Sequence, residues 1–387
     1  METSNQKSNN IKVSVVMPIY NAGEYLSRAI GDVLNQTLND IELICVDDGS
    51  TDNSPSIIKK FAAKDPRIKT LRQPNGGAAV ARNRGLELTE GEYIMFLDAD
   101  DFYEKNLLES LYNIAESGNL DVAVTKYDIY NDSKDSFSVP ADEPHAGIFV
   151  PGGVTSKNEN PEFILTSTTG YAWNKLFRAS FMRDKKLAFD PELYVFEDVH
   201  FVCSALSMAE RVGRVDDILI HHRVYSDQSR ARLFRKYYGQ VPVVYKKIKD
   251  FLMQRGMYVP LKKNFLNLSA GRCYKIYNLL WDDGKEQLWN MLHDEYVNEF
   301  GWLKHDKTDF EENDVCEFVA NVALYTYEEF LHREDKGESI DVGALEEGEI
   351  TKKVTQKQKV SKRRAVWNKI ISFINIFKGL KNKKEKK

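Results

Sequence analysis

Strand-like and helix-like segments alternate over residues 12–97, and this alternation limits the folds that the chain can adopt. The strand-like segments are apolar and rich in β-branched residues, and the segments between them repeat apolar residues at helical spacing. Strands are expected at 12–18, 41–46, 68–72 and 93–97, and helices at 22–35, 54–63 and 78–88. Strands that alternate with helices in this way build a mostly parallel sheet with helices on both faces. We therefore expect an α/β fold.

Polar clusters follow three of these strands directly. The clusters are 18–21 (Pro-Ile-Tyr-Asn), 47–52 (Asp-Asp-Gly-Ser-Thr-Asp) and 98–101 (Asp-Ala-Asp-Asp). One such cluster is an ordinary turn, but parallel strands bring the carboxyl ends of all three to the same edge of the sheet. Open α/β sheets bind their ligands at that edge. The sequence thus predicts a ligand crevice there.

The third cluster also has a composition suited to metal binding. Its Asp-x-Asp pair offers hard oxygen ligands to Mg²⁺ or Mn²⁺, and such a cation can in turn hold a diphosphate. The alternative is a polar turn that caps the next helix, expected over 104–117. The other two clusters at the same edge favour the metal interpretation.

Beyond residue 120 the pattern is less regular. We expect a further strand at 122–127, loops or short hairpins at 131–160, a helix at 162–183, a helix from 197 to about 211, and a strand-like run at 214–225. From 233 to 331 the periodicity is mainly helical. The chain of 387 residues is long enough for two domains.

Composition favours a cytoplasmic location. The chain is 42% hydrophobic and 29% charged, as in ordinary globular proteins. Its four cysteines lie far apart without metal-type spacing, which indicates free thiols in a reducing compartment. No signal peptide is visible, and no apolar run has the length of a membrane span.

The last 37 residues have a charge opposite to that of the rest. Residues 351–387 hold 14 Lys and Arg against one acidic residue, whereas 1–350 hold 40 basic and 57 acidic residues. Apolar residues recur at helical spacing in this basic tail, at Trp367, Ile370, Ile371, Ile374 and Phe377. The pattern predicts an amphipathic helix on an anionic membrane surface, at the inner face of the cell membrane. The alternatives are a helix on the acidic body or a disordered tail; the acidic body argues against nucleic acid.

Four motifs together resemble the donor-binding half of a family 2 glycosyltransferase with the GT-A fold, of the bacterial polysaccharide type. The motifs are 15–21 (Val-Val-Met-Pro-Ile-Tyr-Asn), 47–52, 75–85 (Asn-Gly-Gly-Ala-Ala-Val-Ala-Arg-Asn-Arg-Gly) and 96–101 (Phe-Leu-Asp-Ala-Asp-Asp). The resemblance is strong over 11–128 and looser to about 230. It implies a mostly parallel sheet with helices on both faces, followed by a mainly helical region.

The resemblance also implies donor-binding roles. Pro18 and Tyr20 would shape the pocket for the base, usually uracil, and Asn21 belongs to the same motif. Asp48 would accept a hydrogen bond from the ring N–H of the base. Asp98 would lie near the ribose.

Several roles at the phosphates stay open between alternatives. Asp100 would coordinate the divalent cation, while Asp101 is either its supporting partner or the cap of the next helix. Arg82 either approaches the nucleotide or forms an ion pair with a neighbouring aspartate. Arg223 could clamp the diphosphate. His222 is either a ligand of the metal or phosphate, or a packed or exposed histidine; aromatic residues are usual at 221–222 in the family.

On the acceptor side, Glu197-Asp198 resembles the family's Glu-Asp motif at the start of a helix. Asp198 would be the general base, and Glu197 would support it or contact the acceptor. The alternative is a carboxylate that only stabilises the helix N-terminus. The upstream residues 173–177 (Trp-Asn-Lys-Leu-Phe) also match the family, which favours the base. A base opposite the leaving group implies single displacement with inversion.

The implied function is an inverting, metal-dependent transfer of a sugar from a nucleoside-diphosphate sugar to a glycan acceptor, lipid-linked in cell-surface polysaccharide synthesis. The alternatives are a non-catalytic member of the fold or another nucleotide-using α/β enzyme. The expected divisions are a disordered 1–10, a catalytic domain 11–230 (donor side to 128, acceptor side 129–230), a helical region 231–332, an acidic linker 333–350 and the tail 351–387. The sequence does not define an oligomeric state.

Overall fold

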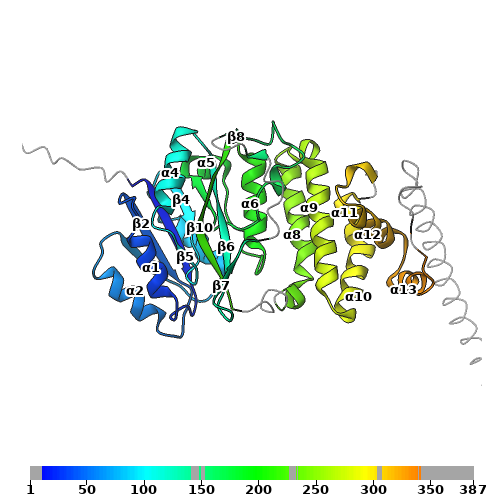
Figure 1. The fold of residues 1–387 in the computed structure, drawn as a ribbon, viewed down its shortest axis with the longest axis horizontal. Helices are drawn as coiled ribbons and strands as arrows, with labels where there is room; N and C mark the ends of the chain where they lie inside the picture. Colours follow the sequence, from blue (N-terminus) through cyan, green and yellow to red (C-terminus); the bar gives the residue numbers. More distant parts are fainter. Residues whose placement is uncertain are drawn as a thin grey trace, which may run out of the picture. The chain divides into compact units, whose positions relative to one another are not determined.

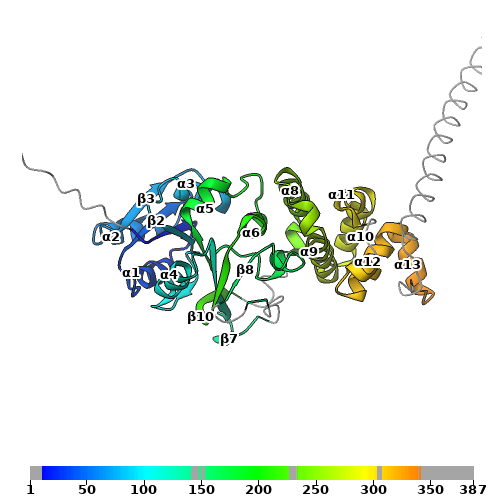
Figure 2. The same ribbon diagram turned by 90° about the horizontal axis from the view of Figure 1, so that it is seen from above.

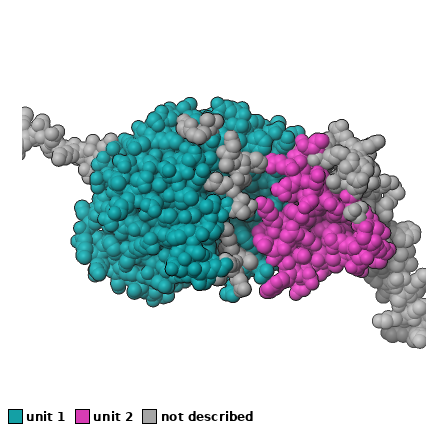
Figure 3. Space-filling model, in the orientation of Figure 1, with its two compact units in different colours: residues 1–272 teal, residues 273–387 magenta. Residues whose placement is uncertain are grey.

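The computed structural model describes residues 11–140, 148–149, 153–225, 232, 234–302, 307–338 and 340. The chain divides into two compact units, residues 1–272 and 273–387 (Figure 3). The predicted N-terminal segment 1–10 and the basic tail 351–387 lie outside the described residues, so the proposed amphipathic helix stays a prediction.

The first four strands form the parallel sheet that the sequence predicts (Figure 1). They are β1 (Val13–Ile19), β2 (Ile41–Asp47), β3 (Ile68–Arg72) and β4 (Tyr93–Phe96), in the spatial order β3-β2-β1-β4. β1 lies between β2 and β4, with Val15 opposite Leu43 on one side and Met95 on the other. β1, β2 and β4 are almost entirely buried, as expected for strands covered by helices on both faces.

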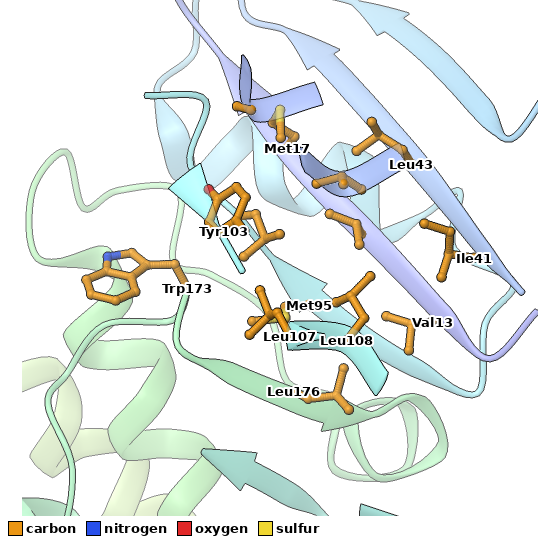
Figure 4. Packing of buried hydrophobic residues seen from close by; sticks show 14 of the residues in the cluster. Val13, Met17, Ile41, Leu43, Met95, Tyr103, Leu107, Leu108, Trp173 and Leu176 are labelled. Carbon is orange, nitrogen blue, oxygen red and sulfur yellow. The ribbon is translucent and has the colours of Figure 1, made fainter. Parts of the chain in front are cut away.

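Helices cover both faces of this sheet, as Figure 2 shows. They are α1 (Leu26–Leu34), α2 (Ser54–Ala62), α3 (Ala78–Leu86) and α4 (Leu107–Ser117). Apolar residues of α1 and α4 share one buried cluster with alternate residues of β1, among them Val13, Val15 and Met17 (Figure 4). α3 packs on the opposite face, where Gly85 allows a close approach. A Cβ atom at Gly85 would lie 2.4 Å from Val16 Cγ1.

The sheet continues into a second, mixed half. Beyond β4 the order is β9 (Lys175–Arg178), β6 (Val122–Asn131), β10 (Val212–Val224) and β5 (Phe102–Tyr103), with β7 (Ser136–Ser138) on β6 and β8 (Val154–Thr155) on β10. β6 and β10 are parallel to each other, whereas β9 is antiparallel to both of its neighbours. The described residues thus form a single ten-stranded sheet.

The prediction of a helix over 162–183 is wrong. This segment instead contains a single 3₁₀ turn (Ile164–Thr166), a loop, strand β9 and the short helix α5 (Ala179–Lys185). β9 pairs with both β4 and β6, and its residues Leu176 and Phe177 are buried on opposite faces. A strand that is buried on both faces lacks polar alternation, so periodicity cannot separate it from a buried helix.

The remaining described elements are mainly helical, which confirms the expected helical C-terminal region. They are α6 (Glu197–Met208), α8 (Gln240–Gln254), α9 (Tyr258–Leu279), α10 (Asp282–Met291), a π-helical turn (Leu292–Tyr296), α11 (Val297–Phe300), a 3₁₀ turn (Lys307–Asp309), α12 (Asn313–Leu324) and α13 (Tyr327–Asp335). In the second unit, the Trp289 ring packs on Phe318 and Phe330, and its Nε1 donates to the Tyr325 carbonyl at 3.0 Å. Within the described part of the chain, no helix has both the length and the hydropathy needed to cross a bilayer.

Candidate active site

The loops after β1 and β2 are joined at the carboxyl edge of the sheet. Asn21 Oδ1 accepts a hydrogen bond from the Thr51 N–H at 2.8 Å, and the Asn21 N–H donates to Ser50 Oγ at 3.1 Å. Asn21 has a φ of 50°, in the left-handed region that asparagine tolerates better than most residues. Pro18 is half-buried, and Tyr20 is 53% exposed. The predicted base-binding residues therefore lie together, with the Tyr20 ring accessible.

Asp48 is buried beneath the loop that precedes α3. Its Oδ1 accepts hydrogen bonds from Gln73 Nε2 and the Gly76 N–H, and its Oδ2 accepts one from the Gly77 N–H, each at 2.8 Å. A carboxylate offers about four acceptor positions, so these bonds leave about one for a ligand. Asp48 thus holds the loop 73–77 in place and keeps one acceptor position.

Asp101 supports the loop 98–101, called the acidic loop below, and does not cap the next helix. It is fully buried; Oδ1 accepts the Arg223 backbone N–H at 2.8 Å and lies 3.1 Å from His222 Nδ1. Helix α4 begins after Asn106, five residues further on. Asp101 therefore does not cap the next helix, and its predicted support of Asp100 stays a prediction.

Asp100 lies in a cluster of negative charge. The Tyr225 hydroxyl donates to Asp100 Oδ2 at 3.0 Å. Burial, and then the neighbouring carboxylates of Asp101 and Asp98, raise the pKa of Asp100 to about 6. A bound cation would relieve this repulsion, and oxygen ligands suit Mg²⁺ or Mn²⁺, so the residues fit the predicted metal.

The chain alone does not complete such a site. Among the described residues, no three His, Cys, Asp or Glu side chains are grouped to hold an ion. Mg²⁺ commonly uses one or two carboxylates together with substrate phosphates. The arrangement therefore suits a cation that Asp100 shares with a ligand's phosphates.

Arg82 joins the donor side to the acceptor side. It is 5% exposed; Nη1 donates to Glu197 Oε1 at 2.7 Å, and Nη2 donates to Asp98 Oδ1 at 3.0 Å. Its guanidinium also lies 5.2 Å from the centre of the Phe189 ring. Burial alone would lower the pKa of Arg82, but the carboxylates of Asp98 and Glu197 outweigh that and raise it. The predicted ion pair with a neighbouring aspartate is present, and the predicted approach of Arg82 to the nucleotide stays a prediction.

The predicted base is at the start of α6. Phe196, the residue before the helix, has a φ of 60°, an uncommon conformation for an aromatic residue. Asp198 is half-buried, and burial followed by the neighbouring Glu197 raises its pKa to about 7, while Arg82 opposes the rise. Such a pKa suits a general base near neutral pH. Strained backbone is often found at functional sites.

Arg223 braces the acidic loop. Its Nε donates to the Asp100 carbonyl at 3.0 Å, and its Nη1 forms an ion pair with Asp132 Oδ1. The guanidinium also lies 4.3 Å from the centre of the Tyr25 ring. The proposed diphosphate clamp would require some of these contacts to be shared with the ligand, and it stays a prediction.

The two histidines of β10 face different neighbours. The His222 ring stacks on Trp173, with centroids 5.0 Å apart, and its Nδ1 faces Asp101. His221 has Nδ1 at 2.8 Å from Asp128 Oδ1 and Nε2 at 3.1 Å from Glu104 Oε1. His222 is thus the one that faces the acidic loop, and its proposed part in metal binding stays a prediction.

One residue beside the site was given no role from the sequence. Lys175, in the middle of the sheet, is fully buried. The signal was present, because a lysine inside an apolar run is an unusual occupant of a buried strand. Lys175 was overlooked because the segment 162–183 was expected to be a helix, and a lysine on a helix usually faces solvent.

Comparison with known proteins finds similarity mainly in the N-terminal half of the chain. Residues 14–185 match the model of glycosyl transferase family 2. Glycosyltransferase GlyG of Streptococcus pneumoniae serotype 4 is 44% identical over 126 residues, which are 32% of this chain and 42% of GlyG. Poly(ribitol-phosphate) β-N-acetylglucosaminyltransferase TarP of Staphylococcus aureus is 37% identical over 201 residues, which are 50% of this chain and 57% of TarP. The chain thus spans about half the length of these curated relatives.

Solved structures show the same fold over most of the chain. S. aureus TarS 1–349 in complex with UDP-GlcNAc superposes with a TM-score of 0.60 and 22% identity, over 90% of this chain and 92% of that one. The fold is the GT-A fold, as predicted.

Proposed function

We propose that this protein transfers a sugar from a nucleoside-diphosphate sugar to a glycan acceptor. The observation that carries the proposal is the pair of hydrogen bonds from buried Arg82 to Asp98 and Glu197. These carboxylates come from segments about a hundred residues apart, one after β4 and one at the start of α6. A single guanidinium holds the donor-side aspartate beside the predicted catalytic pair.

On the donor side, Pro18, Tyr20 and Asn21 border the base pocket, and Asp48 supplies its remaining acceptor position to the base. Asp98 contacts the ribose. Asp100 would hold the divalent cation, with His222 as a second candidate ligand. When bound, the cation stabilises the negative charge that develops on the leaving diphosphate.

On the acceptor side, Asp198 takes the proton from the attacking hydroxyl. Glu197 is oriented by Arg82 and supports Asp198. The hydroxyl then attacks the anomeric carbon from the side opposite the leaving group, so the sugar is transferred in one displacement with inversion. No covalent sugar adduct on the protein is required.

The relatives support a UDP-sugar and a cell-surface polysaccharide. TarP is named as a β-N-acetylglucosaminyltransferase on poly(ribitol phosphate), and a matched Bacillus subtilis protein is named as minor teichoic acid biosynthesis protein GgaB. The matched TarS structure holds UDP-GlcNAc. We propose a UDP-hexose donor and a lipid-linked glycan acceptor, with the basic tail 351–387 holding the enzyme on the inner face of the cell membrane.

A donor screen tests the proposal. The full chain is incubated with UDP-, GDP- and dTDP-sugars and Mn²⁺ or Mg²⁺, and release of the nucleoside diphosphate is measured with and without EDTA. We expect metal-dependent UDP release from one UDP-sugar. Binding without release, with lipid-linked acceptors also present, would favour the non-catalytic alternative; folded protein that binds none of these donors would contradict the proposal.

A further inference from the structure

Lys175 is a buried cation that bonds only to uncharged oxygens. Its Nζ donates to the carbonyls of Thr169 and Tyr171, each at 2.8 Å, and to Asn174 Oδ1 at 2.7 Å. An ammonium group has three N–H donors, and each of them has an acceptor here. Burying a charge is costly unless it is compensated, so a lysine at this position needs a reason.

The segment that Lys175 holds lies directly against the predicted base. A Cβ atom at Gly170 would lie 2.9 Å from Val199 Cγ2 and 3.3 Å from Val199 Cα, so this glycine allows the segment to touch the first turn of α6. The Val199 N–H donates to Asp198 Oδ1 at 2.8 Å. The two carbonyls that flank Gly170 are those that Lys175 holds. A displacement of this segment would therefore reach Asp198 through Val199.

The same segment also reaches the acidic loop. The Tyr171 ring stacks on Trp173, with centroids 4.9 Å apart and planes 13° apart, and Trp173 stacks on His222. His222 in turn faces Asp101. The segment 169–174 thus contacts the first turn of α6 and, through His222, the acidic loop. Lys175 holds this segment through its three hydrogen bonds.

Charge gives Lys175 a second connection to Asp198. Burial raises the pKa of Asp198 most, Glu197 and Asp98 raise it further, and Arg82 and the hydrogen bond from the Val199 N–H lower it. Burial lowers the pKa of Lys175 to about 7, and the carboxylate of Asp198 opposes that fall. The interaction is mutual, so the ammonium of Lys175 favours the ionised form of Asp198.

We propose that Lys175 is a positioning residue for the general base: it holds 169–171 against the first turn of α6 and thereby fixes the place of Asp198. The proposal rests on the proposed function, in which Asp198 is the base. A lysine that served only the fold would affect stability and leave the chemistry of Asp198 unchanged.

The first test replaces Lys175 with methionine, which keeps the length of the side chain. We expect Lys175→Met to keep the wild-type KM for the donor, to lower kcat on the order of tenfold, and to move the acid limb of the pH–rate profile upward by about half a pH unit. The matched control is Lys157→Met, another buried lysine, which bonds to Glu210 and the Ala209 carbonyl beyond the far end of α6. The control should leave kcat and the pH profile unchanged. A folded Lys175→Met enzyme with wild-type kcat and pH profile overturns the proposal.

A second variant covers the case in which Lys175→Met does not fold. Gly170→Ala keeps Lys175 and pushes the segment away from Val199, so it should lower kcat and leave donor binding intact. Gly271→Ala is the matched control, because a Cβ atom there meets nothing within 4 Å. Wild-type kcat in a folded Gly170→Ala protein overturns the proposal.

A final measurement separates this inference from the proposed function. If the wild-type chain shows no turnover, the pKa of Lys175 is measured by NMR of ¹³C-labelled lysine in the wild type and in Asp198→Asn. A lower pKa in the variant supports the connection between Lys175 and Asp198, whatever the reaction. An unchanged pKa overturns it.

Discussion

The two acidic parts of the site differ in how their charge is compensated. Asp100 and Asp198 both have a pKa raised by burial and by neighbouring carboxylates. At Asp198, the chain itself supplies the opposing charge of Arg82. At Asp100, the groups that oppose the rise in pKa are the Tyr225 hydroxyl and His222, and the charge of Arg223 is paired with Asp132. This difference is the reason for the proposal that the donor side uses an external cation and the acceptor side does not.

The largest expected effect is a loss of turnover when Asp198, the proposed base, is replaced. Asp198→Asn should lower kcat by ~10²–10⁴-fold, the usual scale of general-base catalysis. The variant should bind the donor with wild-type affinity, because Asp198 belongs to the acceptor side. Steady-state kinetics and calorimetric donor binding measure both. Near-wild-type turnover would place the base elsewhere.

The next largest expected effect is on stability, when Arg82 is removed. Arg82→Met leaves Asp98 and Glu197 without their shared partner, which should lower the free energy of unfolding by about 3–5 kcal/mol. Arg72→Met is the matched control, since Arg72 pairs with Asp47 at 3.4 Å but has a 59% exposed side chain. The control should cost at most about 1 kcal/mol. Urea unfolding measures both; equal losses would show that burial does not matter to the Arg82 pair.

Removing the carboxylate of Asp100 should weaken donor binding only when the cation is present. Asp100→Ala should weaken Mn²⁺-dependent donor binding by about 10–100-fold. Donor binding in EDTA should be equal for variant and wild type. Titration calorimetry in Mn²⁺ and in EDTA gives the two numbers. Unchanged binding in Mn²⁺ would mean that the cation is held by other residues.

The smallest expected effect is on the pH dependence of stability. Asp100 and Asp198 have a folded-state pKa of about 6 and about 7, above the ordinary value of 3.8, so the folded chain binds more protons than the unfolded chain between these values. These two groups should therefore lower stability as pH rises from about 4 to about 7. Asp100→Asn and added Mg²⁺ should each make this part of the profile flatter. Thermal unfolding across this range tests it, and a profile that neither change affects would contradict the assignment to Asp100.

The parallel half of the sheet could be predicted from the sequence better than the mixed half, for a physical reason. In the parallel half, β1, β2 and β4 are each followed directly by a polar cluster, so local patterns were enough to place Asn21, Asp48 and Asp98 at one edge. β9 was not predicted, because a strand buried on both faces has the same short apolar run as a segment of a buried helix. The contact between Arg82 and Glu197 was not predicted either, because it joins residues 115 positions apart. Lys175 was missed together with β9.

The bonds that Asp48 already makes have a consequence for donor choice. Under the proposed function, a carboxylate with a single vacant lone pair suits a nucleobase that presents one N–H, such as uracil. Guanine presents two adjacent N–H groups, and the second would meet an oxygen already shared by Gln73 and Gly76. The backbone turn in front of α3 would in this way favour uridine donors over guanosine donors.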